Sequence, residues 1–457
     1  MKNKKKLQPQ HVLFVLCVAS FLVPFMGSSI NLALPQIGDT FSMNAVTLTW
    51  LSTIYLISTA IFQVPFARLA DLIGRRKVFE MGLLCFSLSS ILCGFATSGA
   101  ILIGLRFLTG LGSAMQFGTS MAILTAVFPS QQRGKALGIN TAVVYTALAT
   151  GPLLGGLLTH YFGWQSLFII SGVAGLSVIA LSRIFMHTEW VEAKGERFDW
   201  TGSCIYGVGL FGLIYGFTQL PHITGFCWLA SGVMALTGFV FYEQKCPNPV
   251  FNIRIFSGNR VFAFSSLSAL INYAATSAVT FMLSLYLQYI RGFDSRHAGL
   301  ILISQACIQA VFAVLSGRLS DKIPPSRLAT LGMGIIVVGL TGMSFITATT
   351  PIILLIVLLL LLGIGFGIFS SPNTNVIMSS VEKKHYGQAS ATTGTMRLTG
   401  QAFSMGIAGM AIALKLGNQP IHPGVYSAFL DSLQMTFVIF AALCAIGVYA
   451  SSRRKIR

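Results

Sequence analysis

The chain has 457 residues, of which 54% are hydrophobic and only 9% are charged, and its formal net charge is +18. Soluble domains carry about 25% charged residues, so this composition excludes a soluble globular protein and indicates an integral membrane protein with many spans. The basic residues lie in short loops between apolar segments, which is typical of membrane topology and not of a nucleic-acid surface. The eight cysteines contain no CxxC pair, so no metal site or cofactor is expected.

Apolar segments of about 20 residues follow one another along the whole chain and predict membrane-spanning helices. The lysine-rich start precedes an apolar run that reaches Leu34, which is too long for a signal peptide, so we expect an uncleaved first span. The fourteen predicted helices run over 11–34, 46–67, 78–97, 99–122, 134–159, 164–186, 200–218, 224–243, 261–288, 297–317, 327–347, 351–375, 388–414 and 427–450.

The basic residues predict which way these helices cross the membrane. Of the 30 lysines and arginines, 25 fall in loops or termini on one side and three on the other, while Arg106 and Arg397 lie within helices. Because cytoplasmic loops carry the excess of basic residues, we expect a multi-pass protein of the cell membrane with both termini in the cytoplasm.

Two short motifs recur in the second part of the chain and indicate an internal repeat. Residues 67–71 (ARLAD) recur as 317–321 (GRLSD), and residues 133–136 (RGKA) recur as 386–389 (YGQA). We therefore expect an all-α integral membrane protein that resembles the major facilitator plan, with two six-helix halves and a substrate site at their interface. The predicted units are an N-terminal half over 1–186, two extra helices over 187–260 and a C-terminal half over 261–457.

The loop over 67–77 combines an acidic residue, a glycine and four cations, three of which follow the glycine. Asp71 can accept hydrogen bonds from an arginine or from a helix N-terminus, and Gly74 allows a tight turn. We interpret Asp71, Gly74, Arg75 and the repeat counterpart Asp321 as gating residues. The alternative is a solvated loop whose charges only set the topology.

Arg106 lies within a predicted span, where a charge is costly and is a functional hypothesis by default. At its depth the first helix offers Ser28 and Asn31, and we group these three with Arg397 as candidate transport or coupling residues. The alternative for Arg106 is a side chain that extends to the membrane surface. The twelve acidic residues fall in loops or near helix ends, so neither arginine has an expected carboxylate partner within the membrane.

The stretch over 149–156 (ATGPLLGG) lies deep in the fifth predicted helix. Pro152 lacks a backbone N–H and kinks a helix, while Gly151, Gly155 and Gly156 let another backbone approach closely. We interpret the four residues as part of a moving interface, against the alternative of ordinary small-residue packing. The counterpart of this stretch in the second part of the chain keeps small residues but has no proline. We therefore assign the small residues to packing between the halves, and the bend at Gly151-Pro152 to function.

These motifs together resemble the fourteen-helix drug:proton antiporter family of the major facilitator superfamily, the EmrB/QacA type, over nearly the whole chain. The residues that carry the resemblance are 31–35 (NLALP), the loop 67–77, Arg106 with Gly110, the stretch 149–156 and 397–401 (RLTGQ). The resemblance implies export of amphipathic or cationic compounds against proton entry. It assigns Asp71 and Gly74 to a cytoplasmic gate, Arg106 to a proton relay and residues 151–156 to a helix interface.

Two positions depart from the family pattern. Ala67 replaces the first glycine of the loop motif, and Met26 stands where the family has an aspartate near Arg106. A cavity with Arg106 and Arg397 and without a carboxylate favours neutral or anionic amphipaths by simple electrostatics.

Polar side chains in the second-half helices are candidates for the cavity wall. These are Asn272, Gln305, Gln309 and Asn373, together with Met26 of the first helix. Interhelical hydrogen bonding is the alternative role for the amides.

The sequence predicts a transporter that exports hydrophobic or amphipathic small molecules by alternating access, with proton antiport. A translocator of lipids or lipid-like substrates, without classical proton coupling, is the first alternative, and a transport-inactive sensor or scaffold is the second. An enzyme is not expected, because no nucleophile–base set lies within the membrane. The expected partners are a small-molecule substrate, protons and membrane lipids but no nucleic acid, and we expect a monomer.

Overall fold

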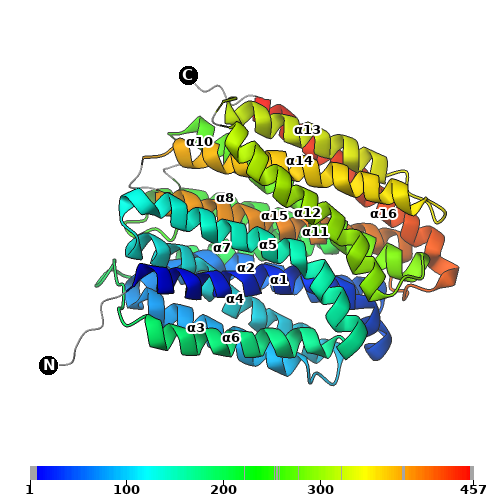
Figure 1. Cartoon of the computed structure of the whole chain (residues 1–457), viewed down its shortest axis with the longest axis horizontal. Coiled ribbons are helices and arrows are strands. Elements are labelled where there is room, and N and C mark those ends of the chain that lie inside the picture. Colours follow the sequence, from blue (N-terminus) through cyan, green and yellow to red (C-terminus); the bar gives the residue numbers. More distant parts are fainter. Residues whose placement is uncertain are drawn as a thin grey trace.

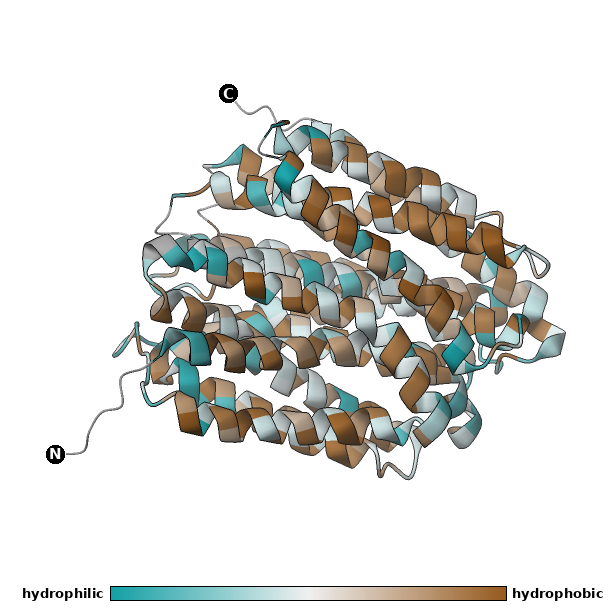
Figure 2. Ribbon diagram, viewed as in Figure 1, coloured by the Kyte–Doolittle hydropathy of each residue, from teal (hydrophilic) through white to brown (hydrophobic). Residues whose placement is uncertain are grey.

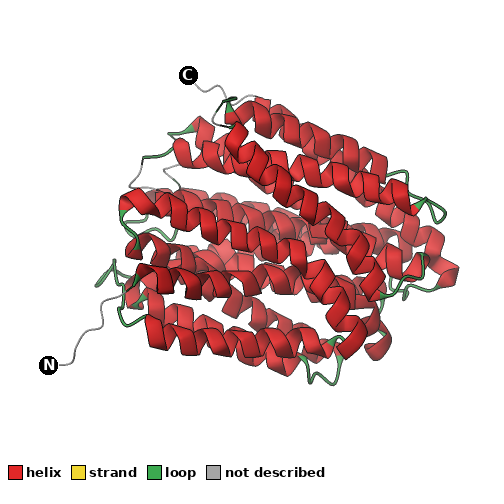
Figure 3. Cartoon of the chain, viewed as in Figure 1, coloured by secondary structure: helices red, strands yellow, loops and turns green. Residues whose placement is uncertain are grey.

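A computed structural model describes residues 8–220, 222–251, 253, 256, 258–275, 277–320, 322–382 and 386–452, without the side chains of 130, 131, 386–388 and 390. Within these ranges the chain forms helices joined by loops, and Figure 3 shows no strand there. The predicted gating residue Asp321 lies outside the described residues.

The first group of helices comprises α1 (Pro9–Phe41), α2 (Ala45–Ile73), α3 (Arg75–Cys93), α4 (Gly99–Val127), α5 (Ser130–Phe162) and α6 (Gln165–Phe185). Two further helices follow, α7 (Trp200–Thr218) and α8 (Ile223–Lys245). The last group comprises α10 (Arg260–Ala274), α11 (Ser277–Leu285), the π-helix η1 (Tyr286–Ile290), α12 (Ser295–Leu319), α13 (Pro325–Met343), α14 (Ile352–Ser379), α15 (Tyr386–Leu416), the 3-10 turn η3 (Pro423–Val425) and α16 (Tyr426–Ser452).

Each of the fourteen predicted helices has a helical counterpart in the structure, but some boundaries were wrong. α1 continues seven residues beyond the predicted end at Leu34, through Pro35 to Phe41, because its last turns are polar but still helical. The ninth predicted helix is interrupted after Ala274, and Ser404 Oγ accepts a hydrogen bond from the freed backbone N–H of Ala278 at 3.0 Å.

Twelve helical segments of the described chain are long and apolar enough to cross a membrane. α3 and α15 are not among these twelve, and both carry charged or polar residues along their length. Figure 2 shows hydrophobic residues along the middle of the helices and more hydrophilic ones toward the ends of the bundle. The chain is therefore an all-helical multi-pass membrane protein.

The helices of the first group pack on one another, and those of the last group do the same. We call these the first and second halves. α5 contacts α12 and α2 contacts α15 across the interface between them, while α7 packs against α8, α2 and α15. Both described termini lie at the same end of the bundle in Figure 1, which we call the terminal end.

The two halves are joined at the other end of the bundle, which we call the distal end. Ser295 Oγ at the start of α12 donates to the carbonyl of Gly156 in α5 at 3.1 Å. The backbone N–H of Ala45 at the start of α2 donates to the carbonyl of Gln419 beyond α15 at 3.2 Å. Ser284 Oγ in α11 donates to the carbonyl of Asn31 in α1 at 2.7 Å. These contacts hold the distal end closed.

Candidate functional site

A cavity lies between the two halves near the middle of the bundle. Residues of α1, α2, α4 and α5 face residues of α10, α11, α12, α14 and α15 across it. Seven of the residues singled out in the sequence line this cavity: Ser28, Asn31, Pro152, Asn272, Gln305, Gln309 and Arg397. The interface between the halves is thus where the predicted polar residues meet.

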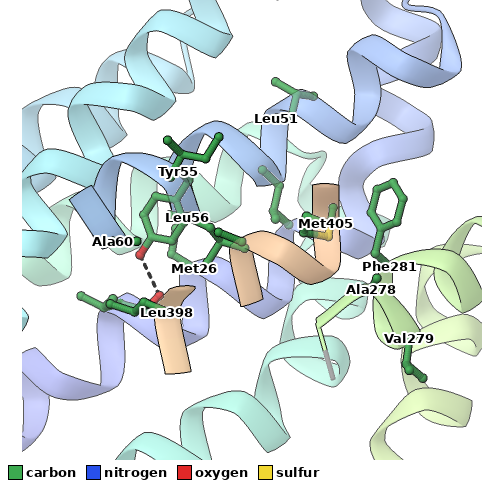
Figure 4. Packing of buried hydrophobic residues seen from close by; sticks show 14 of the residues in the cluster. Met26, Leu51, Tyr55, Leu56, Ala60, Ala278, Val279, Phe281, Leu398 and Met405 are labelled. Carbon is green, nitrogen blue, oxygen red and sulfur yellow. Dashed lines mark hydrogen bonds between the residues drawn. The ribbon is translucent and has the colours of Figure 1, made fainter. Parts of the chain in front are cut away.

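Two predicted cavity residues lie elsewhere. Met26 is fully buried in a hydrophobic cluster that contains residues of both halves, and Figure 4 shows it close to Leu56. Asn373 in α14 is also buried, and its Nδ2 donates to the carbonyl of Ser265 in α10 at 3.3 Å. Neither residue is among the described residues that line the cavity.

The cavity wall is mostly apolar, with a few polar groups. Leu56, Leu302 and Phe366 contribute apolar surface, and the hydroxyls of Tyr145 and Tyr273 meet across the interface at 3.1 Å. The wall contains one charged side chain, Arg397, and none of the described residues that line it is acidic. Concave, largely apolar sites with a few polar groups are typical of small-molecule binding.

Arg397 in α15 reaches the first half. Its guanidinium carbon lies 4.8 Å from the centre of the Phe117 ring in α4. A guanidinium over an aromatic face is attracted by the ring quadrupole. Gln401, one turn further along α15, lines the same cavity and was missed in the sequence, although its spacing from Arg397 places the two on one helix face.

Arg106 in α4 is fully buried, as expected for a residue within a span, but its surroundings differ from the prediction. Its Nε donates to the carbonyl of Leu51 in α2 at 3.0 Å, and its guanidinium carbon lies 4.3 Å from the centre of the Tyr55 ring. Both terminal nitrogens lack a hydrogen-bond partner within the described chain. These contacts come from α2, and none of the described contacts of the guanidinium is with Ser28 or Asn31, the residues predicted at the same depth of α1.

Asn31 and Ser28 instead help to join α1 to other helices. Asn31 Oδ1 accepts a hydrogen bond from Ser52 in α2 at 3.3 Å, while its carbonyl accepts from α11. Ser28 Oγ donates to the carbonyl of Phe25 at 3.3 Å and lies against Gly151 of α5. Both residues therefore combine a place in the cavity wall with packing of α1.

The three glycines of the 149–156 stretch in α5 pack against two different helices. A Cβ added at Gly151 would meet the hydroxyl of Ser28, and one added at Gly155 would lie 2.7 Å from the carbonyl oxygen of Ser29. These two glycines pack α5 on α1 within the first half, so their assignment to packing between halves was wrong. Only Gly156 meets the second half, where its α-carbon faces the backbone of Ser295. α5 remains helical through Pro152.

The loop between α2 and α3 forms an ion-pair cluster at the terminal end. Arg75 Nε donates to Asp71 Oδ1 at 2.7 Å, and its two terminal nitrogens donate to the carboxylate of Glu192 at 2.9 and 2.6 Å. Arg75 Nη1 also donates to the carbonyl of Ala122 in α4 at 3.1 Å. The bidentate pair fixes both distance and orientation. Asp71 and Arg75 therefore form a latch, and its described partners lie in α4 and in the segment after α6.

That segment, residues 187–199, closes over the whole loop motif. Glu189 accepts a hydrogen bond from the backbone N–H of Arg76 at 2.9 Å, and Glu196 pairs with Arg68. Gly74 has a φ of +120°, and a Cβ there would lie 2.6 Å from the Glu189 carboxyl carbon. In the sequence, three glutamates at spacings of three and four mark this segment as a candidate partner for an arginine-rich loop, without indicating which residues pair.

A second cluster lies at the distal end, between α5 and α12. His160 Nδ1 of α5 lies 3.6 Å from Asp294 Oδ2, and Asp294 Oδ1 accepts from the backbone N–H of His297 at 2.8 Å. Burial acts to raise the pKa of Asp294, but the hydrogen bonds from His297 and the nearby imidazoles outweigh it and hold this pKa below its ordinary range. The Asp294 side chain therefore remains charged while it caps α12.

Comparisons with known proteins agree with this architecture. The chain is 27% identical over 440 residues to the riboflavin transporter RibZ of Clostridioides difficile, covering 96% of this chain and 95% of the relative. It is 29% identical over 412 residues to the multidrug resistance protein Stp of Mycobacterium tuberculosis, covering 89% and 76%. An inward-facing, unoccupied bacterial homologue of the lysosomal transporter Spinster superposes with a TM-score of 0.72 at 17% identity, over 98% of both chains. Residues 16–405 match the Major Facilitator Superfamily, and the chain belongs to that family of membrane transporters.

Proposed function

We propose that this transporter exports hydrophobic or amphipathic small molecules from the cell by alternating access, as a fourteen-span member of the drug:proton antiporter group. The observation that carries the proposal is the cavity between the halves, whose wall is mainly apolar and aromatic with scattered amides. Such walls accept varied apolar ligands. The multidrug resistance protein Stp is a relative over most of the chain, which supports the same substrate class.

The closed distal end and the resemblance to an inward-facing structure support a state that opens toward the terminal end. With both termini in the cytoplasm, as the basic loops predict, this state is open to the cytoplasm and ready to load substrate. Rocking of the two halves would then break the distal contacts and release the substrate outside. The Asp71–Arg75 latch and the bend of α5 are the proposed gating elements, and the working unit is a monomer.

Proton entry is the proposed driving reaction, with Arg106 in the coupling region. One observation favours the alternative of a translocator for lipids or lipid-like substrates without classical proton coupling. Among the described residues, Arg106 has no carboxylate partner, and the cavity wall contains no carboxylate. The name of the relative RibZ adds riboflavin to the compounds that deserve testing.

Purified protein in liposomes with an imposed pH gradient tests both alternatives. Uptake of a lipophilic dye that rises with the gradient and stops when nigericin collapses it supports antiport. Uptake that ignores the gradient favours the translocator. Empty liposomes give the background, and Lys415→Gln, at an exposed site in α15 outside the cavity, is the matched control for purification. Absence of transport for dyes, lipids and riboflavin alike would overturn the proposed function.

A further inference from the structure

The described wall of the cavity carries a positive charge and no negative charge. Arg397 is the one charged residue of its described wall, and the described part of the chain offers it neither a hydrogen bond nor an ion pair. Arg106 lies fully buried in the neighbouring core and adds a second positive charge without a carboxylate partner. A positive charge facing a low-dielectric cavity attracts an anion more strongly than it would in water.

The geometry of Arg397 suits an anion. Its guanidinium lies over the Phe117 ring, which covers one face of the guanidinium plane. The N–H groups within that plane have no acceptor in the described chain. Those N–H groups form a planar fork that matches a carboxylate, sulfonate or phosphate bidentately. Because α15 supplies the arginine and α4 supplies the ring, the fork sits where the two halves meet.

Three amide side chains share the cavity wall with Arg397. Gln401 follows one turn after Arg397 on α15, and Gln305 and Gln309 lie one turn apart on α12, all in the cavity wall. These amides can donate to polar atoms next to an anionic group. Leu302 and Phe366 lie on the same wall and provide apolar surface for the rest of a ligand.

We propose that Arg397 binds an anionic group of the transported molecule, so that the substrates are amphipathic anions. This proposal rests on the proposed transport function and adds the charge of the substrate to it. A cationic amphipath would meet the charge of Arg397 and no acidic side chain in the described wall, so we expect it to bind weakly. The anionic group can belong to a soluble organic acid or to the headgroup of a lipid.

Equilibrium binding to the purified protein in nonionic detergent tests the charge preference directly. Titration calorimetry compares naphthalene-2-sulfonate with 2-naphthyltrimethylammonium, which share the aromatic body and differ in charge. We expect the sulfonate to bind the native protein at least about tenfold more tightly. We expect Arg397→Gln to weaken sulfonate binding by at least about tenfold, and Arg397→Lys to weaken it less, because it keeps the charge but loses the fork.

Lys415→Gln is the matched control, since it removes one positive charge from an exposed site on the same helix and should leave both affinities unchanged. Gel filtration and thermal unfolding verify that each variant is folded. If Arg397→Gln is not folded, Gln401→Leu provides a second test, for which we expect a smaller loss of affinity that affects the sulfonate alone. Equal or tighter binding of the cation, no binding of the sulfonate, or unchanged affinity in Arg397→Gln would overturn the proposal.

Nanodiscs distinguish the two sources of the anion. If phosphatidylglycerol nanodiscs weaken binding of the soluble sulfonate relative to phosphatidylcholine nanodiscs, an anionic lipid headgroup occupies the Arg397 site. Equal binding in the two lipids assigns the site to a soluble acid. Binding is measured without transport, so a failure of dye export in liposomes contradicts the proposed function while leaving the anion preference measurable.

Discussion

Gly156→Ala should shift the conformational balance of the transporter, because this position touches the second half at the closed end. The added Cβ would overlap the carbonyl oxygen of Ser295, which belongs to backbone and cannot rotate away. α5 and α12 would have to separate by on the order of 1 Å to restore ordinary contact. Overpacking of this kind costs about 1–3 kcal/mol. A penalty of about 2 kcal/mol confined to the distally closed state lowers its population relative to the open state by a factor of about 30.

Hydrogen–deuterium exchange followed by mass spectrometry measures this shift without labels. Peptides covering 156–166 and 286–300 should exchange faster in Gly156→Ala, because the distal contacts open more often. Gly138→Ala is the matched control, since it lies on the same helix with open space around the added Cβ. That change should leave distal exchange unaltered and stabilise the helix by about 0.5–1 kcal/mol.

Unchanged or slower distal exchange in a folded Gly156→Ala protein would refute the reasoning. It would mean that the contact between α5 and α12 tolerates a methyl group by local adjustment, so that this glycine does not limit closure of the distal end. Uniformly faster exchange over all helices would likewise contradict it, because it would indicate general destabilisation in place of a shift between two states.

Three further changes test other parts of the structure. Arg106→Met should preserve or raise the unfolding temperature. It removes a cation that costs several kcal/mol to bury and whose terminal nitrogens have no partner in the described chain, against the loss of one charged hydrogen bond worth about 1.5–3 kcal/mol. Dye export should fall, and a large drop in unfolding temperature would contradict this reasoning. Gly74→Ala should lower the free energy of unfolding by about 1–3 kcal/mol, because the residue has a positive φ and the added Cβ clashes with Glu189. In a double-variant cycle of thermal unfolding, Glu189→Ala should restore only part of this loss, because it removes the clash but not the strain of the positive φ. Because the pKa of Asp294 is lowered by folding, its stabilising effect is present above the ordinary aspartate pKa of about 3.9 and is lost as the pH falls through the lower folded value. The difference in unfolding temperature between native protein and Asp294→Asn should therefore persist from pH 7 to about 4 and shrink below it; a difference that already vanishes near pH 6 would contradict this.

The sequence predicts the helices well, because the membrane imposes a length of about 20 apolar residues and the arginines and lysines mark the loops. The helix 200–218, for example, has the same bounds in the structure. The burial of Arg106 also follows from its place in an apolar segment. Each of these inferences uses only local sequence and the bilayer as solvent.

What the sequence does not predict is which helices are neighbours. The Arg106 guanidinium contacts Leu51 and Tyr55 of α2, and Gly151 packs on α1 instead of the second half; depth in the membrane leaves this lateral arrangement open. Met26 is apolar and suited both to a cavity and to a core, and only packing decides between them. The pairing of Glu192 with Arg75 joins residues 117 positions apart, so no local pattern contains it.

The position of α7 makes the two sides of the bundle unequal for molecules arriving through the bilayer. α7 lies against both halves, with the Tyr206 hydroxyl donating to the carbonyl of Ala60 in α2 at 3.3 Å and Phe217 beside Phe403 of α15 at 5.8 Å. It therefore covers the seam between α2 and α15 from the lipid. The seam between α5 and α12 has no such covering helix among the described contacts. A hydrophobic compound diffusing within a leaflet would meet α7 before it could reach the seam between α2 and α15, so the extra helices restrict sideways entry on that side of the bundle.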